Sequence, residues 1–176
     1  MFSIPRNRKT LLFILAIGSP IAFSVWQALL NNFAVEVADF GGKEIGMLQS
    51  LREVPGFLAF TVVFLLLIIR QQNFAILSLI ILGIGTALTG FFPSIIGLYI
   101  TTVTMSIGFH YLETLRSSLS LQWLSKDEAP RVLGKLLSVH SVSTLVALSI
   151  LYVVVFMFEP SYTWLYALAG VFTVII

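Results

Sequence analysis

Cysteine is absent from this sequence of 176 residues. Its absence excludes disulfides, thiolate metal sites, iron–sulfur clusters and cysteine nucleophiles. Charged residues are also scarce, at 10% of the chain, whereas a typical soluble domain has about 25%. The formal net charge of +2 is too small for the basic surface by which proteins bind nucleic acid. A soluble globular domain and a nucleic-acid-binding protein are therefore both disfavoured.

Signature motifs of common enzyme and metal-site classes are missing too. The sequence has no GxSxG elbow, no GxxxxGK(S/T) phosphate loop, no GxGxxG turn and no HExxH pair, each of which places particular groups for one kind of chemistry. We therefore expect no catalytic residues, no metal and no cofactor. An intramembrane enzyme is the weakest of the candidate classes.

Apolar residues dominate what is present. They make up 58% of the chain, and the mean hydropathy is +1.01. A helix needs about 20 mainly apolar residues to cross a bilayer core of about 30 Å. We therefore predict an all-α integral membrane protein, a six-transmembrane-helix bundle embedded in the lipid bilayer. Its spans are predicted at residues 11–33, 45–69, 74–91, 95–119, 132–158 and 161–176, after an N-terminal segment of residues 1–10.

The first and last apolar runs differ from the other predicted spans. The first apolar run follows Arg6, Arg8 and Lys9, but it is longer than the core of a signal peptide and has no clear cleavage site. We interpret it as a retained transmembrane helix. The last predicted span is short and has no basic residue after it. We therefore expect the polypeptide to continue past Ile176 into a second bundle.

Basic residues predict the orientation, because cytoplasmic loops retain lysine and arginine. With the N-terminus in the cytoplasm, most basic residues fall on the inner side, and only Lys43 lies in an outer loop. The residues assigned to the inner side are Arg6, Arg8, Lys9, Arg70, Arg116, Lys126, Arg131 and Lys135.

Short connections predict that successive helices are antiparallel neighbours. Small residues within the spans allow helices to approach closely. The candidate pairs are Gly18 with Ala22, Gly83 with Ala87, and Gly42 with Gly46.

Polar residues lie on one face of the first span. Pro20, Ser24, Gln27 and Asn31 recur at intervals of four, three and four, which keeps them on one side of a helix. Two interpretations stay open: the face is the wall of a water-filled cavity, or it makes hydrogen bonds between helices.

The second span carries Arg52 and Glu53 next to Pro55. Neighbours in sequence point about 100° apart on a helix, so we expect each to have other partners as well. Charged residues within a membrane span are costly, and they usually face a cavity or pair across helices. Arg52 and Glu53 are therefore candidates for an outer gate or substrate contact, or else for a structural pair that holds helices together.

The fourth span contains the main candidate for proton coupling. His110, Glu113 and Arg116 follow at intervals of three, which we interpret as adjacent turns of one helix face. A carboxylate beside an imidazole and a guanidinium in a low dielectric can bind and release a proton as water access changes. The alternative is a static pair of Glu113 with Arg116. His140 in the fifth span is a candidate relay or substrate contact, or a histidine that only bonds a neighbouring helix.

The turn between the fourth and fifth spans resembles a segment of a known protein family. Its sequence, Lys-Asp-Glu-Ala-Pro-Arg-Val-Leu-Gly, resembles the charged segment that opens the fifth helix in the major facilitator superfamily, with Asp127, Glu128, Arg131 and Gly134 as the matching residues. Six spans, short outer turns and a third span without charge also resemble the N-terminal half of such a transporter. The chain departs from the family pattern after the second span, where only Arg70 remains of the usual Gly-x-x-x-Asp-Arg-x-Gly-Arg loop.

The resemblance implies a secondary active transporter of a small solute that works by alternating access between two six-helix halves. It also implies a location in a bacterial inner (plasma) membrane and a second six-helix half as partner, in the same chain or another subunit. We expect proton coupling through Glu113, and a solute path lined by Gln27, Asn31, Arg52, Glu53 and His140. The alternative is a non-transporting six-span scaffold or assembly factor of a membrane complex.

Overall fold

The computed structural model describes residues 8–176, and this part of the chain consists of helices joined by short connections, without a strand. Arg6 and the rest of residues 1–7 lie outside the described residues. The helices are α1 (Arg8–Glu36), α2 (Gly42–Phe57), the 3-10 helix η1 (Leu58–Thr61), α3 (Val62–Leu65), α4 (Gln71–Thr89), α5 (Ile95–Trp123), α6 (Ala129–Phe158) and α7 (Tyr162–Ile175).

Five of these segments are long and apolar enough to cross a membrane. They are α1, α4, α5, α6 and the run Gly42–Leu65, which joins α2, η1 and α3. α7 is also apolar but has 14 residues. The predicted all-α fold is thus confirmed, and five of the predicted spans correspond to helices compatible with a membrane bundle, whereas the sixth corresponds to a shorter helix.

The second span is interrupted next to Pro55, although the predicted range of residues 45–69 did not include the change of helix type. α2 ends at Phe57, two residues after Pro55, and the chain continues as a 3-10 turn. Proline lacks the N–H that would bond back to the preceding turn, so a helix weakens at this position. The Thr61 hydroxyl lies 2.7 Å from that of Tyr111 and joins the interrupted segment to α5.

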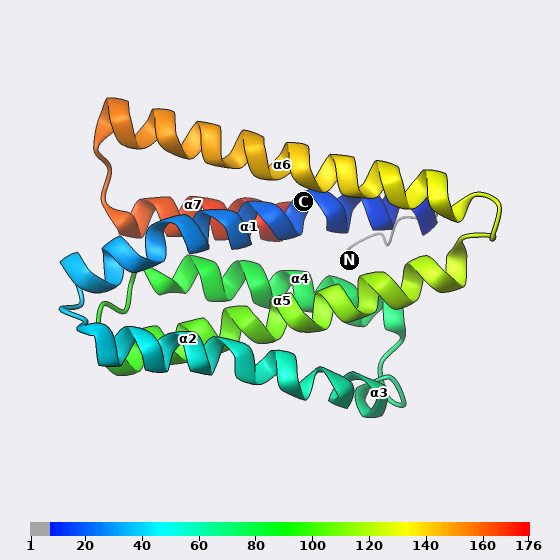
Figure 1. Cartoon of the computed structure of the whole chain (residues 1–176), viewed down its shortest axis with the longest axis horizontal. Helices are drawn as coiled ribbons and strands as arrows, with labels where there is room; N and C mark the ends of the chain where they lie inside the picture. Colours follow the sequence, from blue (N-terminus) through cyan, green and yellow to red (C-terminus); the bar gives the residue numbers. More distant parts are fainter. Residues whose placement is uncertain (1–7) are drawn as a thin grey trace.

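The helices run side by side along the long axis of the molecule (Figure 1). α4 packs against α5 and α7, α1 packs against α6 and α7, and α2 packs against α5. α6 and α2 therefore lie on opposite sides of the bundle, with α1, α4, α5 and α7 between them. α5 and α6 are consecutive in sequence but pack little against each other.

Glycine makes the closest helix contacts of the bundle possible. A Cβ added at Gly108 of α5 would lie 2.7 Å from Leu82 Cα of α4, and one at Gly85 of α4 would lie 2.6 Å from Met105 Cα of α5. The predicted small-residue contact at Gly83 is confirmed, since it faces α7. The prediction for Gly42 and Gly46 is wrong, because both face open space.

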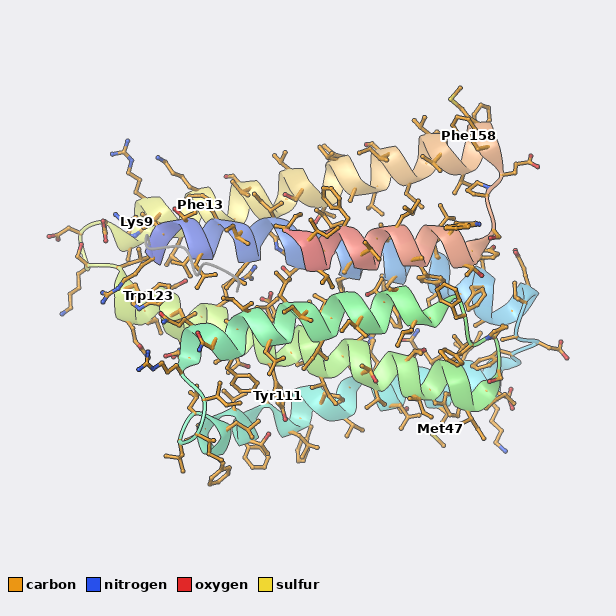
Figure 2. All side chains as sticks on the ribbon, turned by 180° about the vertical axis from the view of Figure 1, so that it is seen from behind. Lys9, Phe13, Met47, Tyr111, Trp123 and Phe158 are labelled. Carbon is orange, nitrogen blue, oxygen red and sulfur yellow. The ribbon has the colours of Figure 1, made fainter. Side chains whose placement is uncertain are left out.

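The two ends of the bundle differ in charge. One end, here called the basic end, is where α1 and α6 begin and α5 ends; the other, the acidic end, contains the α1–α2 and α6–α7 turns. Figure 2 shows Lys9 and Trp123 at the first end and Met47 and Phe158 at the second. The basic end carries Arg8, Lys9, Arg70, Lys126, Arg131 and Lys135, and the acidic end carries Glu36, Asp39, Glu44 and Glu159 with Lys43.

Candidate functional site

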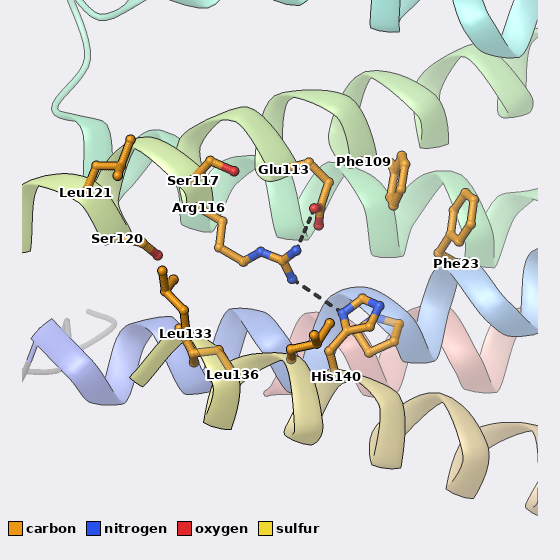
Figure 3. Close-up of a pocket in the computed structure, with 12 residues that line it drawn as sticks. Phe23, Phe109, Glu113, Arg116, Ser117, Ser120, Leu121, Leu133, Leu136 and His140 are labelled. Carbon is orange, nitrogen blue, oxygen red and sulfur yellow. Dashed lines mark hydrogen bonds and ion pairs between the residues drawn. The ribbon is translucent and has the colours of Figure 1, made fainter. Parts of the chain in front are cut away.

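A cavity of about 490 Å³ lies between α1, α5 and α6, in the half of the bundle nearer the basic end. It exists because α5 and α6 separate after their connecting turn and α1 closes the space behind them. Figure 3 shows the side chains of the three helices converging on it. The residues that line it are Pro20, Phe23, Phe109, Glu113, Arg116, Ser117, Ser120, Leu121, Leu133, Leu136, Leu137 and His140.

Glu113 and Arg116 form an ion pair on the wall of this cavity. Arg116 Nη2 donates to Glu113 Oε2 at 2.6 Å, and the two residues are one turn apart on α5. Arg116 Nη1 lies 3.4 Å from Nδ1 of His140 on α6. The guanidinium therefore connects α5 to α6 across the cavity, as the dashed lines in Figure 3 mark.

The carboxylate of Glu113 is only half satisfied. Its Oε1 atom is buried and has no hydrogen-bond partner within the described part of the chain. A buried acceptor without a donor is costly, and more so when it is charged. Protonation would remove the charge, so this carboxyl has a physical reason to exchange a proton with the cavity.

The predicted constellation of His110, Glu113 and Arg116 is divided by the structure. His110 turns towards α2, where its Nε2 atom lies 3.9 Å from Glu53 Oε2 and its ring packs against Gly56. At about 100° per residue, positions three apart differ by about 60°, and positions six apart by about 120°. The interpretation as one face was therefore wrong: Glu113 and Arg116 face the cavity, and His110 faces a second cluster.

The second cluster is centred on Arg52. Its Nε and Nη2 atoms donate to Glu53 Oε1, and its Nη1 donates to Gln27 Oε1 of α1 at 3.0 Å. Ser106 of α5 donates to the Arg52 carbonyl oxygen. The expectation that Arg52 and Glu53 have partners besides each other is confirmed, and the cluster connects α1, α2 and α5.

The residues on the polar face of α1 lie in different surroundings. Pro20 lines the cavity, the Ser24 hydroxyl donates to the Pro20 carbonyl oxygen at 2.5 Å, and Gln27 joins the Arg52 cluster. Asn31, one turn further, is exposed. Both interpretations of this face hold in part, because Pro20 is a wall residue and Gln27 makes an interhelical hydrogen bond.

The loop motif lies at the basic end, next to the start of α1. Lys9 Nζ donates to Glu128 Oε2, and the Glu128 carboxylate also accepts from the Ser125 backbone N–H. These bonds hold the pKa of Glu128 below its ordinary value. Asp127 and Arg131 are exposed, and no atom lies within 4 Å of a Cβ added at Gly134.

Aromatic residues form a part of the site that the sequence did not reveal. Phe23 of α1 stacks on Phe109 of α5 with ring centroids 4.1 Å apart and planes inclined by 12°. Both rings line the cavity. Their pairing depends on how α1 and α5 are rotated, and a chain with 15 phenylalanines offers no signal that singles out these two.

The described residues contain no group of three histidine or acidic side chains placed to hold a metal ion. Comparison with known proteins adds no assignment, since no protein-family model and no curated protein match this chain. The geometry of the cavity is therefore the basis for assigning a function.

Proposed function

We propose that this chain forms the transport bundle of a proton-coupled secondary transporter for a small solute. The observation that carries the proposal is the Glu113–Arg116–His140 cluster on the wall of a cavity between helices long enough to span a membrane. Ionisable residues in membrane spans are expensive, and they commonly mark ion or substrate pathways. A cavity of this volume is within the range of small-molecule sites.

Alternating access requires a second body against which this bundle moves. We propose a second six-helix half, in the same polypeptide or in another subunit, as in the major facilitator superfamily that the sequence resembles. In this arrangement the basic end faces the cytoplasm of a bacterial cell and the bundle lies in the inner membrane. The Arg52 cluster, with Gln27, Glu53 and His110, contributes an outer gate.

Proton coupling is tested with the protein reconstituted in liposomes that enclose a pH-sensitive dye. Amino acids, sugars, organic acids and amines are added outside in turn, and a transported class should drive protons inward. Glu113→Gln should abolish this proton movement, because glutamine cannot exchange a proton. Arg70→Gln, which removes an exposed charge at the basic end, is the control. Full proton-coupled uptake by Glu113→Gln would show that the assignment of Glu113 is wrong.

A scaffold or assembly factor is the second candidate, and one observation favours it. The polar side chains of the Arg52 cluster already satisfy one another within this chain, joining α1, α2 and α5. Such a cluster can serve structure alone. This function predicts that Arg52→Gln and Glu113→Gln lower thermal stability or weaken association with a partner, and that no solute drives protons across the membrane.

A further inference from the structure

The cavity has an apolar body with charge at one position. Of its lining side chains, only Glu113, Arg116 and His140 can carry charge. Most of the remainder are hydrocarbon, namely Pro20, Phe23, Phe109, Leu121, Leu133, Leu136 and Leu137. A ligand that fills this space needs an apolar part of its own and one polar group that meets the charged cluster.

The charged pair offers an entering ligand donors rather than acceptors. The side chains of Arg116 and Glu113 are 22% and 31% exposed, and the Arg116 guanidinium projects between α5 and α6. The one carboxylate oxygen of Glu113 without a partner has almost no accessible surface, and the other is already bound to Arg116. An entering ligand therefore meets a guanidinium before it meets an available carboxylate, which favours an anion over an amine.

We propose that the cavity binds a small organic carboxylate with an apolar, aromatic body and takes up one proton with it. This inference rests on the proposed function, because it names the substrate class of the same site. The ligand carboxylate replaces Glu113 Oε2 as the acceptor of Arg116 Nη2, since a guanidinium binds carboxylates with two parallel hydrogen bonds. The aromatic body packs against the stacked rings of Phe23 and Phe109.

Charge balance explains the proton. With His140 neutral, the Glu113–Arg116 pair has no net charge, and an anion alone would add one negative charge in a low dielectric. A proton from the aqueous phase that binds the displaced Glu113 carboxylate restores neutrality. The protonated carboxyl then needs no cation, and Arg116 stays on the ligand. Uptake of one anion with one proton is therefore electrically neutral.

Other titratable groups near Glu113 are few. Its own helix supplies Arg116, α6 supplies His140, α1 presents only Pro20 and Phe23, and α4 contains no charged residue. On α2, Arg52 and Glu53 face His110, one turn before Glu113. Glu113 is therefore the carboxyl in position to take the proton when Arg116 turns to a ligand.

The test uses the purified chain in lipid nanodiscs and three probes of similar shape: benzoate, neutral benzamide and benzylammonium. Calorimetric titrations in two buffers with different ionisation enthalpies give the affinity and the number of protons taken up. We expect benzoate to bind about tenfold or more tightly than either other probe, with about one proton bound per benzoate. Tighter binding of benzylammonium, or no binding of benzoate, would overturn the proposal.

Variants separate the role of Arg116 in binding the anion from the role of Glu113 in taking up the proton. Arg116→Gln should weaken benzoate binding about tenfold or more. If Arg116→Gln does not fold, Arg116→Lys replaces it in the test. Lysine keeps the charge, so a smaller loss of benzoate affinity is expected. Glu113→Gln should keep benzoate binding but take up almost no protons. Arg70→Gln should match the unmodified protein in both measurements. Unchanged benzoate affinity in a folded Arg116 variant would contradict the anion site.

This inference and the proposed function can fail separately. Benzoate binding with proton uptake but without flux into liposomes would exclude transport and keep the carboxylate site. Proton-coupled flux of a sugar or an amine, without benzoate binding, would keep transport and exclude the carboxylate site.

Discussion

At the scale of single residues, glycine sets how closely α4 and α5 approach. Gly108 faces the backbone of Leu82, and Gly85 faces that of Met105. The hydrophobic effect does not drive helices together inside a bilayer, because lipid tails are as apolar as the side chains. A membrane bundle therefore depends on close packing for its stability. The same helices position Glu113 and Arg116, so the geometry of the cavity depends on these glycines.

Gly108→Ala should therefore destabilise the protein. The added Cβ would lie 2.7 Å from Leu82 Cα, and backbone shifts that relieve such overpacking cost about 1–3 kcal/mol. The measurement is thermal unfolding in detergent or nanodiscs. Gly134→Ala is the matched control, because its Cβ meets nothing within 4 Å and alanine is the better helix former by about 0.8–1 kcal/mol. Equal melting temperatures for both variants would contradict the packing argument.

Spacing along the sequence predicted some residue pairs of the site and not others. Glu113 and Arg116 are three apart on one helix, so their pairing follows from helix geometry. The contact of Arg116 with His140 requires the relative rotation of α5 and α6, which no local pattern contains. His110 was assigned to the wrong cluster because steps of three drift around the helix by about 60° each.

At the scale of helices, hydropathy located the spans but not their full lengths. α5 begins at Ile95 as predicted but continues to Trp123 instead of 119, and α1 is already helical at Arg8, the first described residue. Hydropathy marks the part of a helix that suits lipid, whereas backbone hydrogen bonds can continue the helix into water. Pro55 interrupts the second predicted span, but the 3-10 turn that follows was not predicted, because Phe57 to Leu65 are as apolar as a continuous span.

The contact between the start of α1 and the α5–α6 turn makes stability depend on pH. The pKa of Glu128 is lower in the folded protein than its ordinary value of 4.5, through its bonds to Lys9 and Ser125. This contribution is complete above the unfolded pKa and is lost as the pH falls through the folded pKa. The melting temperature of the unmodified protein should exceed that of Glu128→Gln near neutral pH, and the difference should shrink as the pH falls below 4.5.

Asp127→Asn is the control for this pH dependence. It removes an equal charge from the same turn but leaves Glu128 with its partners. Melting curves of the three proteins across the acidic range give the comparison. A constant difference between Glu128→Gln and the unmodified protein at every pH would mean that the carboxylate charge does not stabilise this contact.

At the scale of the whole molecule, the distribution of basic residues gives the bundle a direction. Most of the described basic residues lie where α1 and α6 begin, and Glu36, Asp39, Glu44 and Glu159 lie at the opposite end. Translocated loops rarely retain lysine and arginine, so the basic end should face the cytoplasm. The cavity would then lie nearer the cytoplasmic side, and its proton exchange would respond to the cytoplasmic pH when it is open to that side.

The absence of cysteine allows this orientation to be measured directly. Lys43→Cys places a thiol in the α1–α2 turn, and Lys126→Cys places one in the α5–α6 turn; both positions are exposed. A membrane-impermeant maleimide added to intact spheroplasts should label Lys43→Cys only, and with inside-out vesicles it should label Lys126→Cys only. The unmodified protein controls for nonspecific reaction, since it has no thiol. Labelling of Lys126→Cys from outside the cell would reverse the orientation and place the cavity nearer the outer surface.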